Sequence, residues 1–295
     1  MSETDQPSSS GAAGSLVTAA FSFSLMSLFA RLAGAAMPSL EVVFVRSLVS
    51  LALTVAFLRR SGLSSWRGTH PLLLTLRGFV GFGALTCFFY SVVHLPLAEA
   101  TVIQFTGPIF TALIAWGYLG ERATGRVWAA IVLGLAGVLL IARPAALFTA
   151  AASTLPTGVV VVGLAGAFLT ACAHVLVRRL APYEHELVII LYFPLVAAPA
   201  SLVALVPIWV WPDLRGWLLL LAVGVAAQGG QVFLTRGMKH VTAAGASVIL
   251  YLQIVFATLW GLLVLAERPD AWTLGGSVLV LGGTLVAARR PRLPA

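Results

Sequence analysis

The sequence predicts an all-α integral membrane protein whose ten transmembrane helices form two inverted five-helix repeats. The 295-residue chain is 60% apolar and 9% charged, with a mean hydropathy of +1.00, whereas soluble domains carry about 25% charged residues. Residues 98–143 recur at 244–289 without a gap, with about 16 of 46 positions identical. Each half holds five apolar spans, and an odd number of crossings makes the second half enter the membrane upside down.

The ten spans follow one another with short connections. Apolar stretches of about 20 residues cross a bilayer as helices. We expect them at 14–33, 40–58, 72–93, 97–119, 127–142, 157–177, 187–208, 216–236, 243–265 and 272–288. The first repeat then covers 14–143 and the second 157–289, joined by a loop at 144–156. Residues 1–13 and 290–295 are expected to be tails, the first of them disordered.

The positions of Lys and Arg predict the orientation. One side would hold Arg59, Arg60, Arg67, Arg77, Arg122, Arg126, Arg178, Arg179, Arg236, Lys239, Arg289, Arg290 and Arg292, and the other Arg31, Arg143, Arg215 and Arg268. Cytoplasmic loops are the ones rich in these residues. We therefore expect a multi-pass protein of the cell membrane with both termini in the cytoplasm.

The net charge of +8 does not indicate nucleic-acid binding, because the arginines are scattered in short loops and form no basic stripe. Cys87 and Cys172 both lie in apolar runs, which argues against a disulfide framework or a metal cluster. The sequence therefore predicts no metal, no cofactor and no nucleic-acid partner.

Several motifs lie along the chain. They are the line from Pro108 to Leu119-Gly120-Glu121, the GxxGVLLI run from Gly134, their counterparts LAER and GGSVLVLGGTLV, Arg46 in EVVFVRS, Arg77-Gly78, and Gly229-Gly230-Gln231 with Thr235. Together they resemble the ten-helix EamA-type members of the drug/metabolite transporter superfamily. The superfamily's usual Trp-Gly in the first helix is replaced here by SFSLMSLFAR. The resemblance covers about residues 15–290 and implies transport of small solutes by alternating access.

Polar side chains in a membrane helix are costly unless they face the bundle or water. Stripes at helical spacing are formed by Thr101, Gln104, Pro108 and Thr111, by Gln228, Gln231 and Thr235, by Ser247, Tyr251 and Thr258, and by Ser24, Ser27 and Arg31. From these we take Gln104, Pro108, Thr111, Gln228, Gln231, Tyr251, Ser24 and Ser27 as candidates for lining a central substrate cavity. The alternative is that they hydrogen-bond between helices without touching a solute.

Five charged residues are candidates for a structural or gating role. Arg46 lies inside a span and is expected to pair with Glu99, although binding of an anionic substrate group is the alternative. Glu121 and Glu267 are equivalent in the two repeats and end their helices at opposite faces. We expect a helix cap or ion pair at each, with a gate charge as the alternative. Arg77 opens the third span.

The leading functional hypothesis is a transporter of a small organic solute, such as a metabolite or amino acid, working as a monomer in the lipid bilayer. An integral membrane enzyme is the main rival class, and His185 between Glu184 and Glu186 is its densest candidate site. A membrane assembly or signalling module is the third. The sequence favours transport and not an enzyme.

Overall fold

The computed structural model describes residues 9–34, 37–62, 66–95, 97–142, 156–264 and 270–288. In the first repeat it has α1 (Ser9–Gly34), α2 (Ser39–Arg60), α3 (Pro71–His94), α4 (Leu97–Gln104), α5 (Gly107–Ile114) with a π-helical turn (Ala115–Leu119), and α6 (Gly125–Ala142). In the second it has α8 (Thr157–Leu180), α9 (Glu186–Leu205) with a 3₁₀ turn (Val206–Ile208), α10 (Leu214–Met238), α11 (Ala243–Ile249), α12 (Leu252–Val264) and α13 (Ala271–Ala288).

These helices make ten membrane-spanning segments over the described ranges, because α4 with α5 and α11 with α12 each count as one. Eight segments are at least 18 residues long and strongly apolar, and α6 and α13 are shorter apolar helices. Large apolar side chains such as Phe79, Val132, Val203 and Leu285 are more than half exposed. A surface of this kind requires lipid as its solvent, so the predicted class is confirmed.

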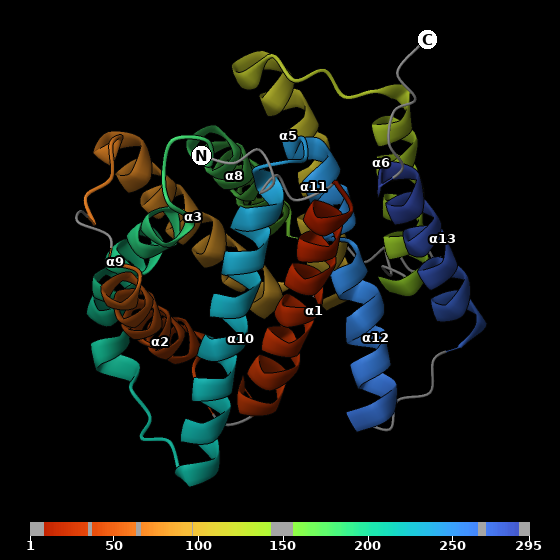
Figure 1. Ribbon diagram of the computed structural model, residues 1–295. Helices are drawn as coiled ribbons and strands as arrows, with labels where there is room; N and C mark the ends of the chain where they lie inside the picture. Colours follow the sequence, from red (N-terminus) through yellow and green to blue (C-terminus); the bar gives the residue numbers. More distant parts are fainter. Residues whose placement is uncertain are drawn as a thin grey trace.

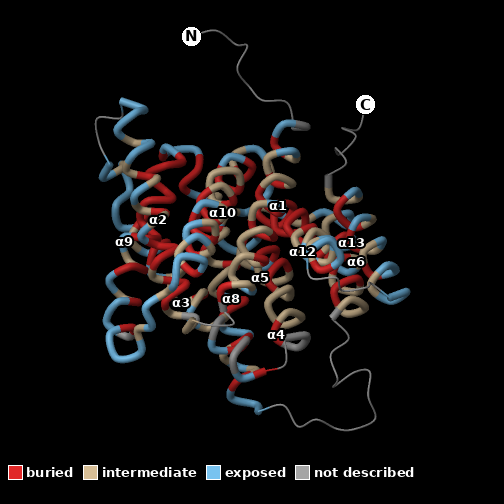
Figure 2. Tube along the Cα trace, turned by 90° about the horizontal axis from the view of Figure 1, so that it is seen from below, coloured by how far each residue is buried: buried red, intermediate tan, exposed pale blue. Residues whose placement is uncertain are grey.

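The packing of the helices has the symmetry of the repeat. The most extensive contacts are α1 with α10, α3 with α8, α2 with α9, and α6 with α13. The repeat makes α1, α2, α3 and α6 equivalent to α8, α9, α10 and α13. The α1–α10 contact is therefore equivalent to the α8–α3 contact, and the α2–α9 and α6–α13 contacts each join two equivalent helices. In Figure 1, α2 and α9 form one edge of the bundle and α6 and α13 the opposite edge, with α1 and α10 between them. Buried residues gather on the faces that the helices turn toward one another (Figure 2).

Small residues allow the closest of these contacts. A Cβ added at Gly137 would lie 2.5 Å from the carbonyl oxygen of Gly276, and one added at Gly276 would lie 2.6 Å from that of Gly137. Close backbone approach through glycine is a common way of packing helices in membranes. α6 and α13 therefore pack with their backbones in near contact.

Two of the predicted spans are not continuous. The span expected at 97–119 is interrupted at Phe105–Thr106, and the one expected at 243–265 at Leu250–Tyr251. At both breaks the backbone bonds shorten from i→i−4 to i→i−3, as in Ile109 N–H to the carbonyl of Thr106. Pro108 explains the first break because it lacks an N–H group. The second break contains neither proline nor glycine.

The first helix begins earlier than expected. Residues 9–13 were assigned to the tail, yet they belong to α1. Ala12 is buried, and its carbonyl would be 3.3 Å from a Cβ added at Gly237 of α10. Packing on α10 thus extends the helix. Of the predicted loop at 144–156, residues 144–155 lie outside the described residues, as does the predicted tail at 290–295.

Candidate functional site

The two helix breaks meet in the middle of the protein. The Tyr251 hydroxyl donates a hydrogen bond of 2.9 Å to the carbonyl oxygen of Phe105, and the two rings lie 5.4 Å apart between centroids. Tyr251 is fully buried, and a Cβ at Gly134 of α6 would overlap its ring. In the register of the repeat, Phe105 and Tyr251 are equivalent residues. The junction therefore joins one discontinuous helix of each repeat at the same position.

A chain of polar contacts runs from this junction toward α8. Thr111 donates to the carbonyl of Gly107 at 3.0 Å and accepts from the Ser247 hydroxyl at 3.3 Å. The Ser247 hydroxyl also contacts Nδ1 of His174 at 3.3 Å. Gln104 lies beside this chain and donates its amide to the Thr170 hydroxyl at 3.2 Å. Pro108 is buried at the start of α5.

The α1 candidates contact α12. Ser24 is fully buried and accepts a bond of 2.9 Å from Nε1 of Trp260. Ser27 accepts a longer bond of 3.3 Å from the amide of Gln253. Both serines thus tie the first helix of one repeat to the broken helix of the other.

The two α10 glutamines differ in their surroundings. Gln228 is 2% exposed and holds α2, since it accepts from Ser50 at 2.7 Å and donates to Thr54 at 2.8 Å. Gln231 is partly exposed and accepts a bond of 3.0 Å from Nη2 of Arg77. The packing therefore commits Gln228 to joining helices, whereas Gln231 keeps a free amide group among the described contacts.

Arg77 is not a loop residue. The count of loop charges placed it outside the membrane, but it lies in α3 and is only 4% exposed. Its guanidinium turns inward, where it reaches Gln231 and lies over the ring of Phe193. Arg46 lies over the same ring. The side chain of Glu99, its expected partner, is outside the described set, so the Arg46–Glu99 pair stays a prediction.

Glu121 joins the two repeats at one end of the bundle. Its carboxylate accepts a bond of 2.8 Å from Nε of Arg178 and one of 3.0 Å from the N–H of Ala243, the first residue of α11. Nη1 of Arg178 also donates to the carbonyls of Met238 and Lys239 at 2.9 Å. Glu121 thus caps a helix of the other repeat, where its charge suits the positive end of the helix dipole. Glu267 lies outside the described residues.

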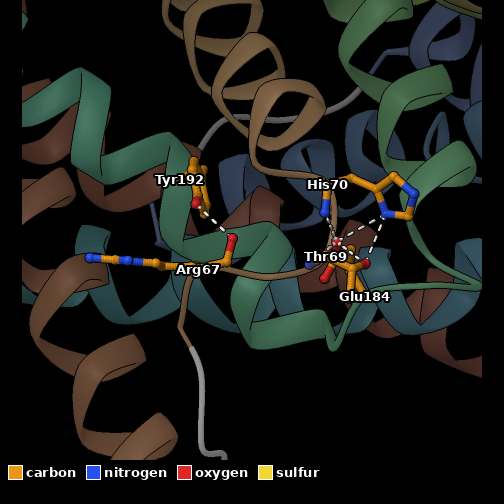
Figure 3. A network of polar contacts seen from close by, with 5 residues as sticks. All are labelled: Arg67, Thr69, His70, Glu184 and Tyr192. Atoms are coloured by element: carbon orange, nitrogen blue, oxygen red, sulfur yellow. Dashed lines mark hydrogen bonds and ion pairs between the residues drawn. The ribbon is translucent and has the colours of Figure 1, made fainter.

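A second carboxylate joins the repeats at the same end, which we call the Glu121 end. Figure 3 shows the side chain of Glu184, from the turn between α8 and α9, hydrogen-bonded to Thr69 and His70 just before α3. One of its oxygens accepts from the N–H and hydroxyl of Thr69, both at 2.7 Å, and from the N–H of His70 at 2.6 Å. Tyr192 donates to the carbonyl of Arg67 at 2.9 Å. Burial would raise the pKa of Glu184, but these hydrogen bonds outweigh it and hold the pKa below its usual range.

The comparison with known proteins decides the family. The family model described as the EamA-like transporter family matches residues 11–143 and again 157–289. The chain belongs to the EamA-like transporter family. As an EamA transporter of the drug/metabolite superfamily, it carries small solutes across a membrane and is not an enzyme.

Named relatives of this EamA transporter agree with that function. It is 37% identical to the pseudopaline exporter CntI of Pseudomonas aeruginosa (strain UCBPP-PA14), over 92% of this chain and 94% of the relative. It is 29% identical to solute carrier family 35 member G1 of Mus musculus, over 93% and 77%. It is 26% identical to an S-adenosylmethionine uptake transporter of Rickettsia bellii (strain RML369-C), over 85% and 84%. A solved structure titled "Crystal structure of protein" has the same fold, with a TM-score of 0.80, 23% identity and coverage of 94% and 96%.

The candidate enzyme cluster of this EamA transporter has a structural role. Glu184 holds Thr69 and His70, while Glu186 pairs with Arg236 at 2.6 Å. Nδ1 of His185 accepts from the N–H of Leu187 and so caps α9. Across the described ranges no three His, Cys, Asp or Glu side chains lie close enough to hold a metal ion. The cluster stabilises the Glu121 end of the bundle.

Proposed function

We propose that the solute of this transporter crosses the membrane between the two repeats, at the junction of the broken helices. The observation that carries the proposal is the hydrogen bond from Tyr251 to the carbonyl of Phe105. Discontinuous helices at corresponding positions of two inverted repeats are the best structural indication of a binding site in a transporter. Rocking of one repeat against the other about this junction would expose the site to each side of the membrane in turn.

The candidate cavity residues fall into two groups, those that contact the solute and those that support the helices around it. Gln104 and Gln231 are partly exposed and keep amide atoms free of described hydrogen bonds. We assign the first contacts with solute to these two glutamines. Pro108 and Thr111 lie on α5, which follows Gln104 at the end of α4. Ser24, Ser27, Gln228 and Tyr251 form the supporting wall.

The Glu121 end faces the cytoplasm in this proposal, and the protein lies in the cell membrane with both termini inside. The excess of Arg and Lys in the loops at that end supports this orientation, even with Arg77 removed from the count. A single chain supplies both halves of the junction, which supports a working monomer. The identity of 37% to the pseudopaline exporter supports export of a small organic metabolite.

The test is transport by purified protein in liposomes. Labelled pseudopaline and S-adenosylmethionine are offered separately, and at least one is expected to move in a protein-dependent, saturable manner. Gln104→Ala and Gln231→Ala are each expected to lower the rate about tenfold, because each removes hydrogen bonds worth about 1.4 kcal/mol. Thr86→Ala, on an exposed face of α3, is the matched control. The proposal fails if neither solute moves, or if both glutamine variants transport as well as Thr86→Ala.

A further inference from the structure

Two arginines from different helices meet on one aromatic ring inside the bundle. The guanidinium carbons of Arg46 in α2 and Arg77 in α3 lie 5.2 Å and 5.3 Å from the ring centroid of Phe193 in α9. Arg46 is 8% exposed and Arg77 is 4% exposed. The ring face attracts both cations, which orients the two side chains. Two positive charges are thereby held close together within the membrane-spanning part of the protein.

No described carboxylate neutralises this pair. The carboxylates of Glu121, Glu184 and Glu186 are bound to other side chains, namely Arg178, His70, Arg236 and Lys239. Glu41, on α2 with Arg46, instead accepts from the N–H of Val210 at 3.3 Å. Among the described residues, the pair therefore lacks a counter-charge.

The hydrogen-bonding capacity of the pair is also largely unused. Nη2 of Arg77 donates to Gln231, but Nε and Nη1 of both arginines are buried with no acceptor among the described residues. Four buried donor nitrogens in this state, on two like charges, cost much free energy in a low-dielectric interior. Such groups occur in membrane proteins chiefly where a ligand or water supplies the missing acceptors.

The repeat does not reproduce the pair. In the register that matches the two halves, Arg46 corresponds to Tyr192 and Arg77 to Val223. The scaffold around them is shared, since α3 contacts α9 much as α10 contacts α2. The positive charge is therefore a feature of one repeat alone, as expected of a ligand site and not of a packing device common to both.

We propose that Arg46 and Arg77 bind a carboxylate group of the transported solute, so that the substrate is an organic anion. A carboxylate has about four lone-pair sites for hydrogen bonds, enough to accept one N–H from each of the four unused nitrogens of the pair. Gln231 belongs both to this anion site and to the proposed solute contacts, because its side-chain carbonyl accepts the hydrogen bond from Arg77. The inference rests on the proposed function and names the substrate class for it.

The first test measures binding without transport. The full-length protein in detergent is heated with succinate, with the uncharged succinamide, or with inorganic phosphate, at constant ionic strength. Succinate is expected to raise the melting temperature by about 5 °C at saturation, because a ligand stabilises the folded state that binds it. Succinamide is expected to have no effect. No shift with succinate, or an equal shift with phosphate, would overturn the assignment to carboxylates.

The second test separates binding from folding. Arg46→Gln and Arg77→Gln are each expected to weaken succinate binding about 10- to 100-fold. Without ligand, both variants are expected to melt no lower than the wild type, because each removes an uncompensated buried charge. Arg215→Gln, at an exposed position at the start of α10, is the control. If both variants bind succinate as the control does, or melt well below the wild type without ligand, the arginines are structural.

The two proposals fail in different ways. If the liposome assay shows no flux of either solute, the proposed transport function is lost. If flux is normal in Arg46→Gln and Arg77→Gln and their succinate binding is unchanged, only the anion site is lost.

Discussion

The two ends of the bundle are held by different chemistry. At the Glu121 end, Glu121 and Glu184 each bridge the repeats with several bonds of 2.6–3.0 Å. At the opposite end, which we call the Glu41 end, the described bridges are a bond of 3.3 Å from the N–H of Val210 to Glu41 and, four residues before the end of α12, the bond of 2.9 Å from Trp260 to Ser24. Asp213 there only caps its own helix. The described bonds predict that, in this conformation, the Glu121 end is locked and the Glu41 end separates more easily.

Among substitutions at the two ends, Glu184→Gln is expected to lower the free energy of unfolding most. The substitution removes the charge from an oxygen that accepts from Thr69 and His70, and hydrogen bonds to charged groups contribute about 1.5–3 kcal/mol. We expect the free energy of unfolding in detergent to fall by about 3 kcal/mol. Asp213→Asn, at an exposed site where asparagine can still cap α10, is the control. A fall no larger than that of the control would show that Glu184 does not lock this end.

Protonation of Glu184 in acid is expected to cause the same loss of stability, and to do so reversibly. The pKa of Glu184 lies below its ordinary value of 4.5, so the carboxylate stabilises the fold fully above about pH 4.5. This stabilisation disappears as the pH falls through the lowered pKa of the folded state. The stability difference between wild type and Glu184→Gln should therefore narrow in acid, as measured by unfolding at several pH values. A gap that stays constant well below pH 4 would contradict the prediction.

Glu121→Gln is expected to open the locked end without unfolding the protein. It weakens the bonds to Arg178 and Ala243, and a loss of about 2 kcal/mol changes the ratio of closed to open molecules about 30-fold. Spin labels at Thr124 and His240, both exposed, report the separation of the repeats at this end by pulsed EPR. Asp213→Asn provides the comparison. An unchanged distance distribution in Glu121→Gln would show that Glu121 does not hold the two repeats together at this end.

The smallest effect is expected from Glu41→Gln. Glu41 is fully buried, but its bond to Val210 is long and its other oxygen has no partner among the described residues. Removing a poorly compensated buried charge should be nearly neutral, within about 0.5 kcal/mol of the wild-type unfolding free energy. A loss as large as that of Glu184→Gln would mean that the two ends are equally locked.

The sequence predicted the class, the ten spans and the repeat because these depend on composition and period, which survive without knowledge of packing. For one of the two helix breaks, Pro108 is a local cause that can be read in the sequence. The break at Leu250–Tyr251 has no such signal, since it accompanies a contact between Tyr251 and the other repeat. A break caused by tertiary packing is invisible to local propensity.

The polar stripes identified which helix faces are polar but not which neighbour each face meets. Gln228 and Gln231 lie on one stripe, yet Gln228 is committed to α2 and Gln231 to Arg77. Glu121 pairs with Arg178 and caps α11, and both of these partners belong to the other repeat. The inward turn of Arg77 depends on Phe193, far away in the chain. Partners of this kind are set by helix packing, which spacing alone does not determine.

The charge pair of Arg46 and Arg77 has an electrical consequence. Both side chains are buried in the membrane-spanning part of the bundle, and moving one elementary charge through a potential of 100 mV changes the free energy by about 2.3 kcal/mol. Any step that displaces α2 or α3 along the membrane normal therefore does electrical work. A bound monoanion would halve the charge on which the field acts, so the empty and the loaded carrier would respond differently to the voltage across the membrane.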